Sequence, residues 1–113
     1  MSAQWELIGK GADPRLGSEW RHLSLAENLR SGRRIWWAYN AVHRQDLRGA
    51  LDRLRQPALI VNPQDDLWAR TRAIAARHPG ISYAELPGAG HGVFHAERAK
   101  ISRLVRDFLD AGS

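Results

Sequence analysis

Two short segments in the second half of the chain constrain its fold most, because both have the composition of β-strands. The apolar run Ala58-Leu59-Ile60-Val61 follows Pro57 and precedes a turn-forming stretch at 62–66. An apolar run of this length is typical of a strand in a parallel sheet, buried on both faces. Residues Ile81 to Leu86 alternate partly between apolar and polar side chains and predict a second strand.

Each predicted strand is followed by a segment with helical character. Leu67 to His78 is rich in helix formers and ends at Pro79-Gly80. Ala96 to Leu109 has the apolar spacing of an amphipathic helix. The order strand, helix, strand, helix predicts a right-handed crossover and two neighbouring parallel strands. The predicted fold class is therefore α/β.

The first 55 residues contain helical patterns and no strand pattern. Gly9, Gly11, Pro14 and Gly17 interrupt the stretch from Met1 to His22, which we expect to be loop. With 113 residues in all, the chain has room for one small domain.

Short helices are expected between residues 24 and 54. Ser24-Leu25-Ala26-Glu27 fits a capping box, and the helix that it starts should end near Gly32. Residues 33–43 predict a helix that is apolar on more than one side and therefore needs cover from several directions. Asp46 can cap a further helix from Leu47 to Leu54.

Composition excludes several kinds of site. The chain has no cysteine, which rules out disulfide scaffolds, thiol nucleophiles, zinc ribbons and iron–sulfur clusters. Its 43% hydrophobic and 26% charged residues are typical of a globular protein. The first residues lack the layout of a signal peptide, and no apolar run is long enough to span a membrane, so we expect a cytoplasmic protein.

The net charge of +5 arises mainly in the first half of the chain. Residues 1–57 carry ten cations and six anions, whereas residues 58–113 carry seven and six. Such an excess can mark a surface for nucleic acid or another acidic partner. The cations are scattered among acids, however, and a solvated helical surface accounts for them more simply.

Carboxylates and an imidazole follow the two predicted strands. Asp65 and Asp66 come after the first strand, and His91 lies in the glycine-rich loop 87–92 after the second. In parallel sheets, ligands and catalytic groups gather at the carboxyl ends of the strands. Adjacent strands lie about 4.8 Å apart, so we expect these side chains to form an Asp–His pair.

These segments resemble the carboxyl-terminal part of the α/β-hydrolase family, over about half of the chain. The likeness rests on three stretches: Pro57 to Val61 followed by Asp65-Asp66, then Leu86-Pro87-Gly88-Ala89-Gly90-His91-Gly92, then Ile101 to Leu109. In that family the acid of the catalytic triad follows the penultimate strand and the histidine base follows the last one.

The resemblance implies His91 as the base and Asp66 as the acid, with Asp65 as the alternative. Asp66 would hold the imidazole tautomer and stabilise the imidazolium. Pro63 departs from the family pattern, which often has glycine three residues before the acid. The shape of this turn is therefore an open point of the resemblance.

The resemblance also requires a nucleophile before the acid in the chain. No Gly-x-Ser-x-Gly elbow is present, and neither Ser18 nor Ser31 has its glycine spacing. The implied protein is a fragment of an α/β-hydrolase of esterase or lipase type, or a small protein that kept two strand–helix units. In either case we expect it to be inactive alone.

The same resemblance divides the chain into two regions. Residues 1–55 would form a cap-like helical region, and residues 56–113 the βαβα unit. Trp36, Trp37 and Tyr39 would face an apolar substrate pocket, although packing in a core or against another subunit is the simpler role for such aromatic residues.

Other interpretations of these residues have less support. His91, His95 and Glu97 could suggest a metal site, but the stretch starts in a loop, and we expect neither metal nor cofactor. Gly9-Lys10-Gly11 lacks the spacing and the preceding strand of a phosphate loop. Asp65-Asp66 could also cap the helix that follows, a role compatible with orienting a histidine.

A sheet of two parallel strands leaves two open edges, which are prone to pair with another chain. We therefore expect self-association through sheet edges or swapped helices. Two alternative functions remain. One is a stand-alone basic module that binds an acidic partner or nucleic acid. The other is a residual hydrolysis in which Asp66 and His91 act as acid and base on a water molecule.

Overall fold

A two-stranded parallel sheet organises the second half of the chain. In the computed structural model, which describes residues 2–112, β1 (Leu59–Pro63) pairs in parallel with β2 (Ser82–Leu86). Helix α5 (Trp68–Arg77) connects the strands, and helix α7 (Arg98–Ala111) follows the second one. Both predicted strands, their parallel pairing and the connecting helix are confirmed, and the protein belongs to the mixed α/β class.

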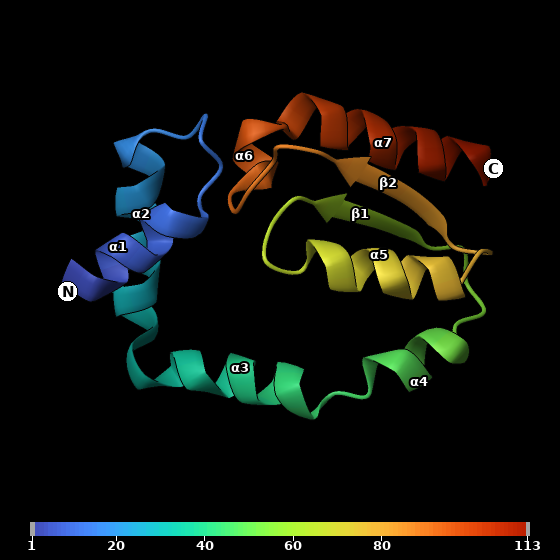
Figure 1. The fold of residues 1–113 in the computed structure, drawn as a ribbon, viewed down its shortest axis with the longest axis horizontal. Helices are drawn as coiled ribbons and strands as arrows, with labels where there is room; N and C mark the ends of the chain where they lie inside the picture. The colour runs from blue at the N-terminus through green and yellow to red at the C-terminus, as the bar shows by residue number, and fades with distance from the viewer. Residues whose placement is uncertain (1, 113) are drawn as a thin grey trace.

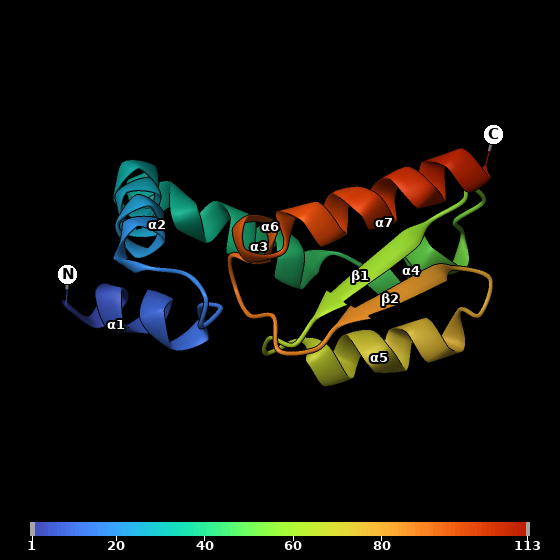
Figure 2. The same ribbon diagram turned by 90° about the horizontal axis from the view of Figure 1, so that it is seen from above.

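The helices α5 and α7 cover opposite faces of the sheet (Figure 1, Figure 2). The small core lies beneath α7, where the sheet meets the loop after β2. Its buried apolar residues are Leu86, Ala89, Val93 and Ile101, with Val61 and Leu104 packed against them.

The strand β1 is less buried than its composition predicts. Leu59, Ile60 and Val61 are only partly buried, and Asn62 is the buried residue of this strand. The reason is that β1 has one strand neighbour among the described residues, so its other edge is left unpaired. The expectation of a strand buried on both faces is therefore wrong for β1, whose apolar side chains are only partly buried.

The amino-terminal stretch is helical, which corrects the expectation of a loop from Met1 to His22. Helix α1 (Ser2–Gly11) and helix α2 (Ser18–Ser31) occupy most of it, and Met1 lies outside the described residues. Gly11, Pro14 and Gly17 stand at the helix ends and in the connection, and Gly9 lies in the last turn of α1, so these residues prevent neither helix.

The predicted capping box is also wrong, although the predicted helix end is correct. Ser24 lies inside α2, whose amino-terminal cap is Gly17, and the helix ends at Gly32 with a φ of 52°. Helix α1 packs against α2 through Arg21, whose guanidinium lies 4.1 Å from the Trp5 ring centroid and donates to the Trp5 carbonyl at 2.8 Å.

The middle of the chain forms a short 3₁₀ turn (Gly32–Arg34), helix α3 (Ile35–Arg44) and helix α4 (Leu47–Asp52). Asp46 caps α4 as predicted, because its carboxylate accepts a hydrogen bond from the Gly49 amide at 3.0 Å. Helix α4 is tied to α5 by His78, whose Nε2 lies 2.8 Å from Asp52 Oδ1.

Helix α3 is not packed against neighbouring elements on several sides, although its apolar composition predicts this, and large apolar side chains of this helix are exposed. Trp36, Trp37 and Val42 are 66%, 70% and 67% exposed. Figure 1 shows α3 on the far side of α5 from α7, away from the sheet.

Helix α6 (Val93–Ala96) precedes α7, so the final predicted helix is divided near its start. The carboxyl ends of both strands point toward α1 and α2 (Figure 2), which brings the amino-terminal segment next to the loops that leave the sheet. Within residues 2–112, no helix has both the length and the hydrophobicity to cross a membrane.

Candidate functional site

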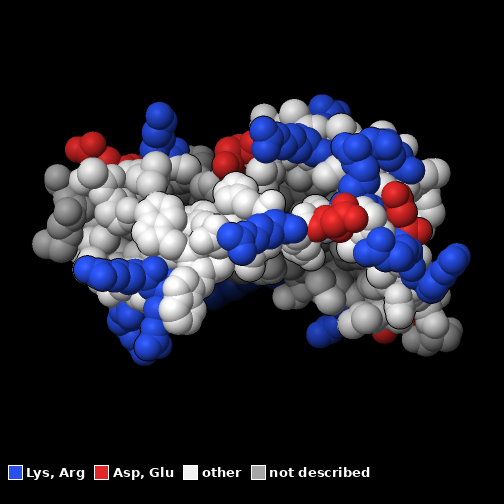
Figure 3. Space-filling model, turned by 90° about the horizontal axis from the view of Figure 1, so that it is seen from below, with Lys and Arg blue, Asp and Glu red and all other residues white. Residues whose placement is uncertain are grey.

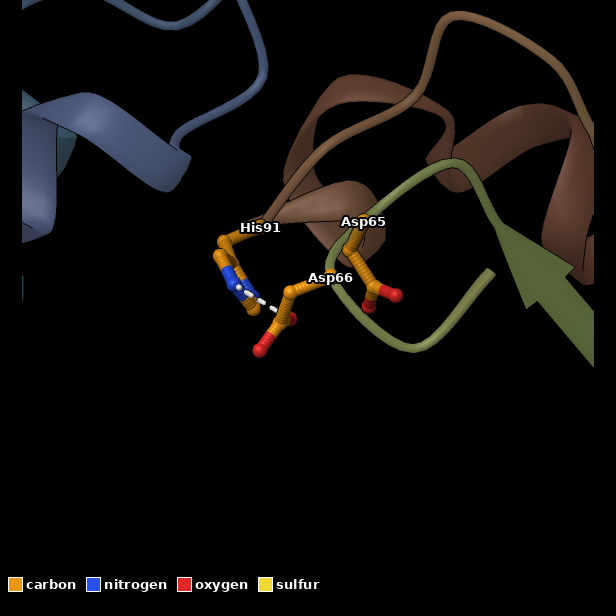
Figure 4. Close-up of side chains that lie close together, drawn as sticks. All are labelled: Asp65, Asp66 and His91. Atoms are coloured by element: carbon orange, nitrogen blue, oxygen red, sulfur yellow. Dashed lines mark ion pairs between the residues drawn. The ribbon is translucent and has the colours of Figure 1, made fainter. Parts of the chain in front are cut away.

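The loops after β1 and β2 bring a carboxylate and an imidazole together at the carboxyl edge of the sheet. His91 Nε2 lies 3.3 Å from Asp66 Oδ1 (Figure 4). The parallel register, which sets Pro63 opposite Leu86, ends both strands at the same level and delivers the two loops side by side. The expected Asp–His pair is present.

The neighbouring carboxylate has a different role. Asp65 Oδ1 accepts a hydrogen bond from the Leu67 amide at 2.9 Å, and its carbonyl accepts one from the Trp68 amide at 3.2 Å. Asp65 thus shapes the turn into α5, while Asp66 meets His91. Of the two roles expected of the Asp65-Asp66 dipeptide, the contact with the histidine is present at Asp66. The cap of the following helix is not, because Leu67 occupies the N-cap position of α5 and the helix has no side-chain cap hydrogen bond.

The contact with Asp66 uses the Nε2 atom of His91. A carboxylate on Nε2 favours the tautomer that carries its proton there, which leaves the Nδ1 lone pair as the proton acceptor. In serine-hydrolase triads the acid holds Nδ1, and Nε2 faces the nucleophile. The pair in this chain therefore has the opposite orientation of the ring.

The pair is largely open to solvent. The side chain of Asp66 is 75% exposed and that of His91 is 51% exposed. Exposed ion pairs are screened by water and stabilise a fold little. The contact between Asp66 and His91 is therefore not what holds the two loops in place.

A cleft of about 910 Å³ opens beside His91. Leu7, Lys10 and Tyr39 line it together with the residues of the two loops. Of the aromatic residues expected to face a substrate pocket, Tyr39 lines this cleft, whereas Trp36 and Trp37 are absent from the described part of its wall.

The described wall of the cleft contains no serine, threonine or cysteine. Ser18 instead lines a separate cavity of about 230 Å³ between the amino-terminal helices, and Ser31 is the last residue of α2. Neither serine lies in the described wall of the cleft beside His91, where it could give its proton to the imidazole.

Three of the described side chains could together hold a metal ion. One ligand atom from each of Asp65, Asp66 and His91 lies within 4.8 Å of the others. Carboxylate oxygen and imidazole nitrogen suit zinc and other first-row divalent ions. His95 and Glu97 do not join this set, and Glu97 instead bonds to Arg15.

A buried carboxylate that no sequence pattern indicates lies beside the His91 loop. Asp13 is 1% exposed, and its Oδ2 atom accepts a hydrogen bond from the Gly90 amide at 3.1 Å. The Arg15 guanidinium bonds to this carboxylate and lowers the pKa of Asp13 well below its ordinary range, against the opposing effect of burial. Asp13 falls in the stretch expected to be loop, and no motif marks it.

A second side chain links the two loops directly. Gln64 Oε1 accepts a hydrogen bond from the Gly88 amide at 2.9 Å. Among the described residues, the site thus comprises the Asp66–His91 pair, the turn residues Asp65 and Gln64, and the amino-terminal segment that contacts the His91 loop. Comparison of the chain with protein-family models, with curated proteins and with solved structures finds no match.

Proposed function

We propose that this chain is the acid-and-base part of an α/β-hydrolase-like catalyst that cleaves ester-type bonds, and that it does not turn over substrate alone. The observation that supports the proposal most is the 3.3 Å contact between His91 Nε2 and Asp66 Oδ1 at the carboxyl ends of two parallel strands. General bases in this type of chemistry need such a carboxylate, because it fixes the tautomer and stabilises the imidazolium.

In the proposed reaction His91 takes a proton from a nucleophile through Nδ1 and later returns it to the leaving group. Asp66 stays ionised and holds the proton on Nε2. The partly apolar wall of the cleft, which includes Leu7 and Tyr39, favours a substrate with an apolar portion.

The nucleophile would come from another polypeptide segment. The described wall of the cleft offers no hydroxyl or thiol other than the Tyr39 phenol. The unpaired edge of β1 offers a place where further strands could extend the sheet. Added strands of this kind are what a nucleophile-bearing segment needs to reach the same edge as His91.

The acid–base pair is tested by the ring nitrogens of His91. In nitrogen-15 spectra recorded about two pH units above the ordinary imidazole pKa, the proposal expects the tautomer protonated at Nε2 to dominate. A free histidine side chain already favours protonation at Nε2, so Asp66→Asn should reduce the preference to that intrinsic ratio. Asp65→Asn should preserve the wild-type ratio, because Asp65 bonds to the turn. Equal tautomer ratios in the wild-type chain and in Asp66→Asn would overturn the proposed pair.

The missing nucleophile is tested by activity. The isolated chain should release no nitrophenol from nitrophenyl esters beyond the rate of a His91→Ala variant. A fluorophosphonate probe should label no serine. Covalent labelling of Ser18 or Ser31 would contradict the proposal, and a rate that depends on both His91 and Asp66 without labelling would point to direct activation of water.

The alternative of a basic binding module has weaker support. Figure 3 shows cations spread over the lower face, with acidic groups among them, and no single continuous basic patch. Several arginines are already paired with carboxylates: Arg15 with Asp13 and Glu97, Arg30 with Glu27, and Arg72 with Glu85. Salt-sensitive retention on immobilised nucleic acid at low ionic strength would favour this alternative.

A further inference from the structure

We propose that Asp13 is a positioning residue for His91, and that the segment of residues 11–15 is an integral part of the site. This inference rests on the proposed function, because positioning matters only if His91 acts on a substrate. It assigns a role to a region that the sequence suggested was a loop. The side chain of Asp13 does not contact the imidazole and would act through the backbone of the His91 loop.

The first support is a backbone clamp on His91. The His91 amide donates a hydrogen bond to the Gly11 carbonyl at 2.8 Å, and the His91 carbonyl accepts one from the Asp13 amide at 2.8 Å. The segment thereby pairs with His91 as a parallel β-bridge centred on Ala12. Both backbone polar groups of His91 are used, so its main chain is held by the amino-terminal segment.

The second support is the Asp13 carboxylate, which fastens this clamp. Its Oδ2 atom accepts from the Gly90 amide at 3.1 Å and from Arg15 Nη2 at 2.7 Å. Its Oδ1 atom accepts from Arg15 Nε at 2.8 Å and from the Arg15 amide at 3.0 Å. A buried carboxylate with four charge-assisted hydrogen bonds is a stiff anchor, since losing any donor leaves a buried charge poorly solvated.

The anchor is also connected to the last helix. The Arg15 guanidinium bonds to Glu97, the residue immediately before α7. One arginine therefore links the buried carboxylate beside the His91 loop with the helix that covers the sheet. The loop is fixed between the amino-terminal segment and α7.

The third support is the steric fit between the two segments. A Cβ atom at Gly90 would lie 2.9 Å from the Asp13 nitrogen and 3.0 Å from the Gly11 carbonyl oxygen. A Cβ atom at Gly11 would collide with Cδ2 of the His91 ring. The absence of side chains at both positions lets the backbones approach closely and lets the imidazole lie against Gly11.

The consequence concerns how His91 meets Asp66. Because that pair is solvent-exposed, its own attraction is too weak to orient the ring. The buried Asp13 carboxylate and the backbone bonds of residues 11–13 fix the main chain of His91, and this restricts the orientation of the imidazole. Loosening the anchor should therefore weaken the Asp66–His91 contact without touching either side chain.

The test uses the full chain and the ring nitrogens of His91, assigned by the signals that disappear in His91→Gln. In Asp13→Asn we expect the preference for the Nε2-protonated tautomer to fall toward the ratio seen in Asp66→Asn. Glu27→Gln is the matched control, because it removes a carboxylate from an exposed ion pair on α2 and should leave the tautomer ratio unchanged. A folded Asp13→Asn variant that keeps the wild-type ratio overturns the inference.

A second variant and a wild-type measurement keep the inference testable if Asp13→Asn does not fold. Arg15→Ala removes the half-exposed side chain that bonds to the Asp13 carboxylate. This variant should lower the tautomer preference in the same direction as Asp13→Asn, by a smaller amount. In the wild-type chain, the amides of Gly90 and His91 should exchange with deuterium far more slowly than the amides of Asp65 and Asp66 in the turn before α5. Exchange of both amides at the unprotected rate would also overturn the inference.

The two proposals fail in distinguishable ways. If the wild-type chain shows the same tautomer ratio as Asp66→Asn, the Asp66–His91 pair itself is absent, and the proposed function fails. If the wild-type preference is present and survives in both Asp13→Asn and Arg15→Ala, only the positioning role of Asp13 fails.

Discussion

At the residue scale, the site depends on two aspartates with opposite surroundings. Asp66 is 75% exposed and contacts the imidazole, whereas Asp13 is 1% exposed and contacts only groups that hold the loop. The exposed carboxylate can change partners easily. The buried one cannot, because its Arg15 and Gly90 donors have no replacement in the interior.

Replacement of Asp13 should make the protein less stable and less sensitive to acid. Bonding to Arg15 lowers the pKa of Asp13 in the folded state relative to the unfolded chain. The resulting stabilisation is fully present above the unfolded value of about 3.9 and is lost as the pH falls through the folded value. Asp13→Asn should lower the free energy of unfolding by about 2 kcal/mol at pH 7.

Urea denaturation at pH 7 and at pH 3 measures this effect. The loss of stability between the two pH values should be smaller in Asp13→Asn than in the wild-type chain. Equal losses in the two proteins would contradict a depressed pKa at Asp13.

Gly90 should tolerate no side chain, because its neighbours are backbone atoms of the amino-terminal segment. Gly90→Ala places a methyl group 2.9 Å from the Asp13 nitrogen, and overpacking of this kind costs about 1–3 kcal/mol. Gly80→Ala is the matched control, since nothing lies within 4 Å of its added carbon. Thermal unfolding of both variants should show a lowered midpoint only for Gly90→Ala.

The candidate pair was predictable from sequence and its anchor was not. Asp66 and His91 each follow a segment with a clear strand pattern, and parallel strands end at a common edge. Asp13 acquires its role only when residues 11–13 lie against His91, a contact between positions far apart in the chain. No local spacing encodes such a contact, so sequence reasoning had no signal for it.

At the element scale, prediction succeeded where a segment carries its own periodicity. The apolar spacing of α7 and the strand character of β1 and β2 are local, and the structure contains all three. Prediction failed for α1 and for the start of α2, because glycine and proline were taken as breakers throughout residues 1–22. The helix predicted from Ser24 to near Gly32 coincides with the rest of α2. In the structure the same residues bound helices whose interiors are good helix formers.

The junction of α4 with α5 should weaken at alkaline pH. The Ile74 carbonyl first, and then Asp52, raise the pKa of His78 above its ordinary value. Stabilisation from a raised pKa is fully present below the unfolded value of about 6.5 and is lost as the pH rises through the folded value. Helix α4 should therefore be held more firmly at pH 6 than at pH 9.

Limited digestion with trypsin reports this change, since Arg53 and Arg55 directly follow α4. The chain should be cut there more slowly than His78→Gln at pH 6, and the difference should shrink at pH 9. A difference of the same size at both pH values would show that the protonated imidazole does not hold α4.

At the scale of the whole molecule, the protein leaves much apolar surface uncovered. Its radius of gyration is 16.0 Å, compared with about 13 Å for a compact domain of this length. The exposed side chains of α3 and the unpaired edge of β1 account for the incomplete cover. Such surfaces in one small chain commonly mark places where another chain binds.

We expect the protein to self-associate, and two surfaces can be tested separately. One is the pair Trp36 and Trp37 on α3, which are 66% and 70% exposed. The other is the cleft of about 670 Å³ lined by residues of β1 and α7, where Phe94 is 75% exposed. Association would remove these aromatic rings from water, which is favourable because burial of apolar surface stabilises a complex.

Sedimentation at several micromolar concentrations decides between these surfaces. If α3 forms the contact, replacing Trp36 and Trp37 with Gln should shift the chain toward monomer while Phe94→Gln leaves its mass unchanged. If the cleft lined by β1 and α7 forms the contact, the two results should be reversed. A wild-type chain that remains monomeric throughout would show that both surfaces stay exposed to solvent unless a different polypeptide, such as the nucleophile-bearing segment, covers them.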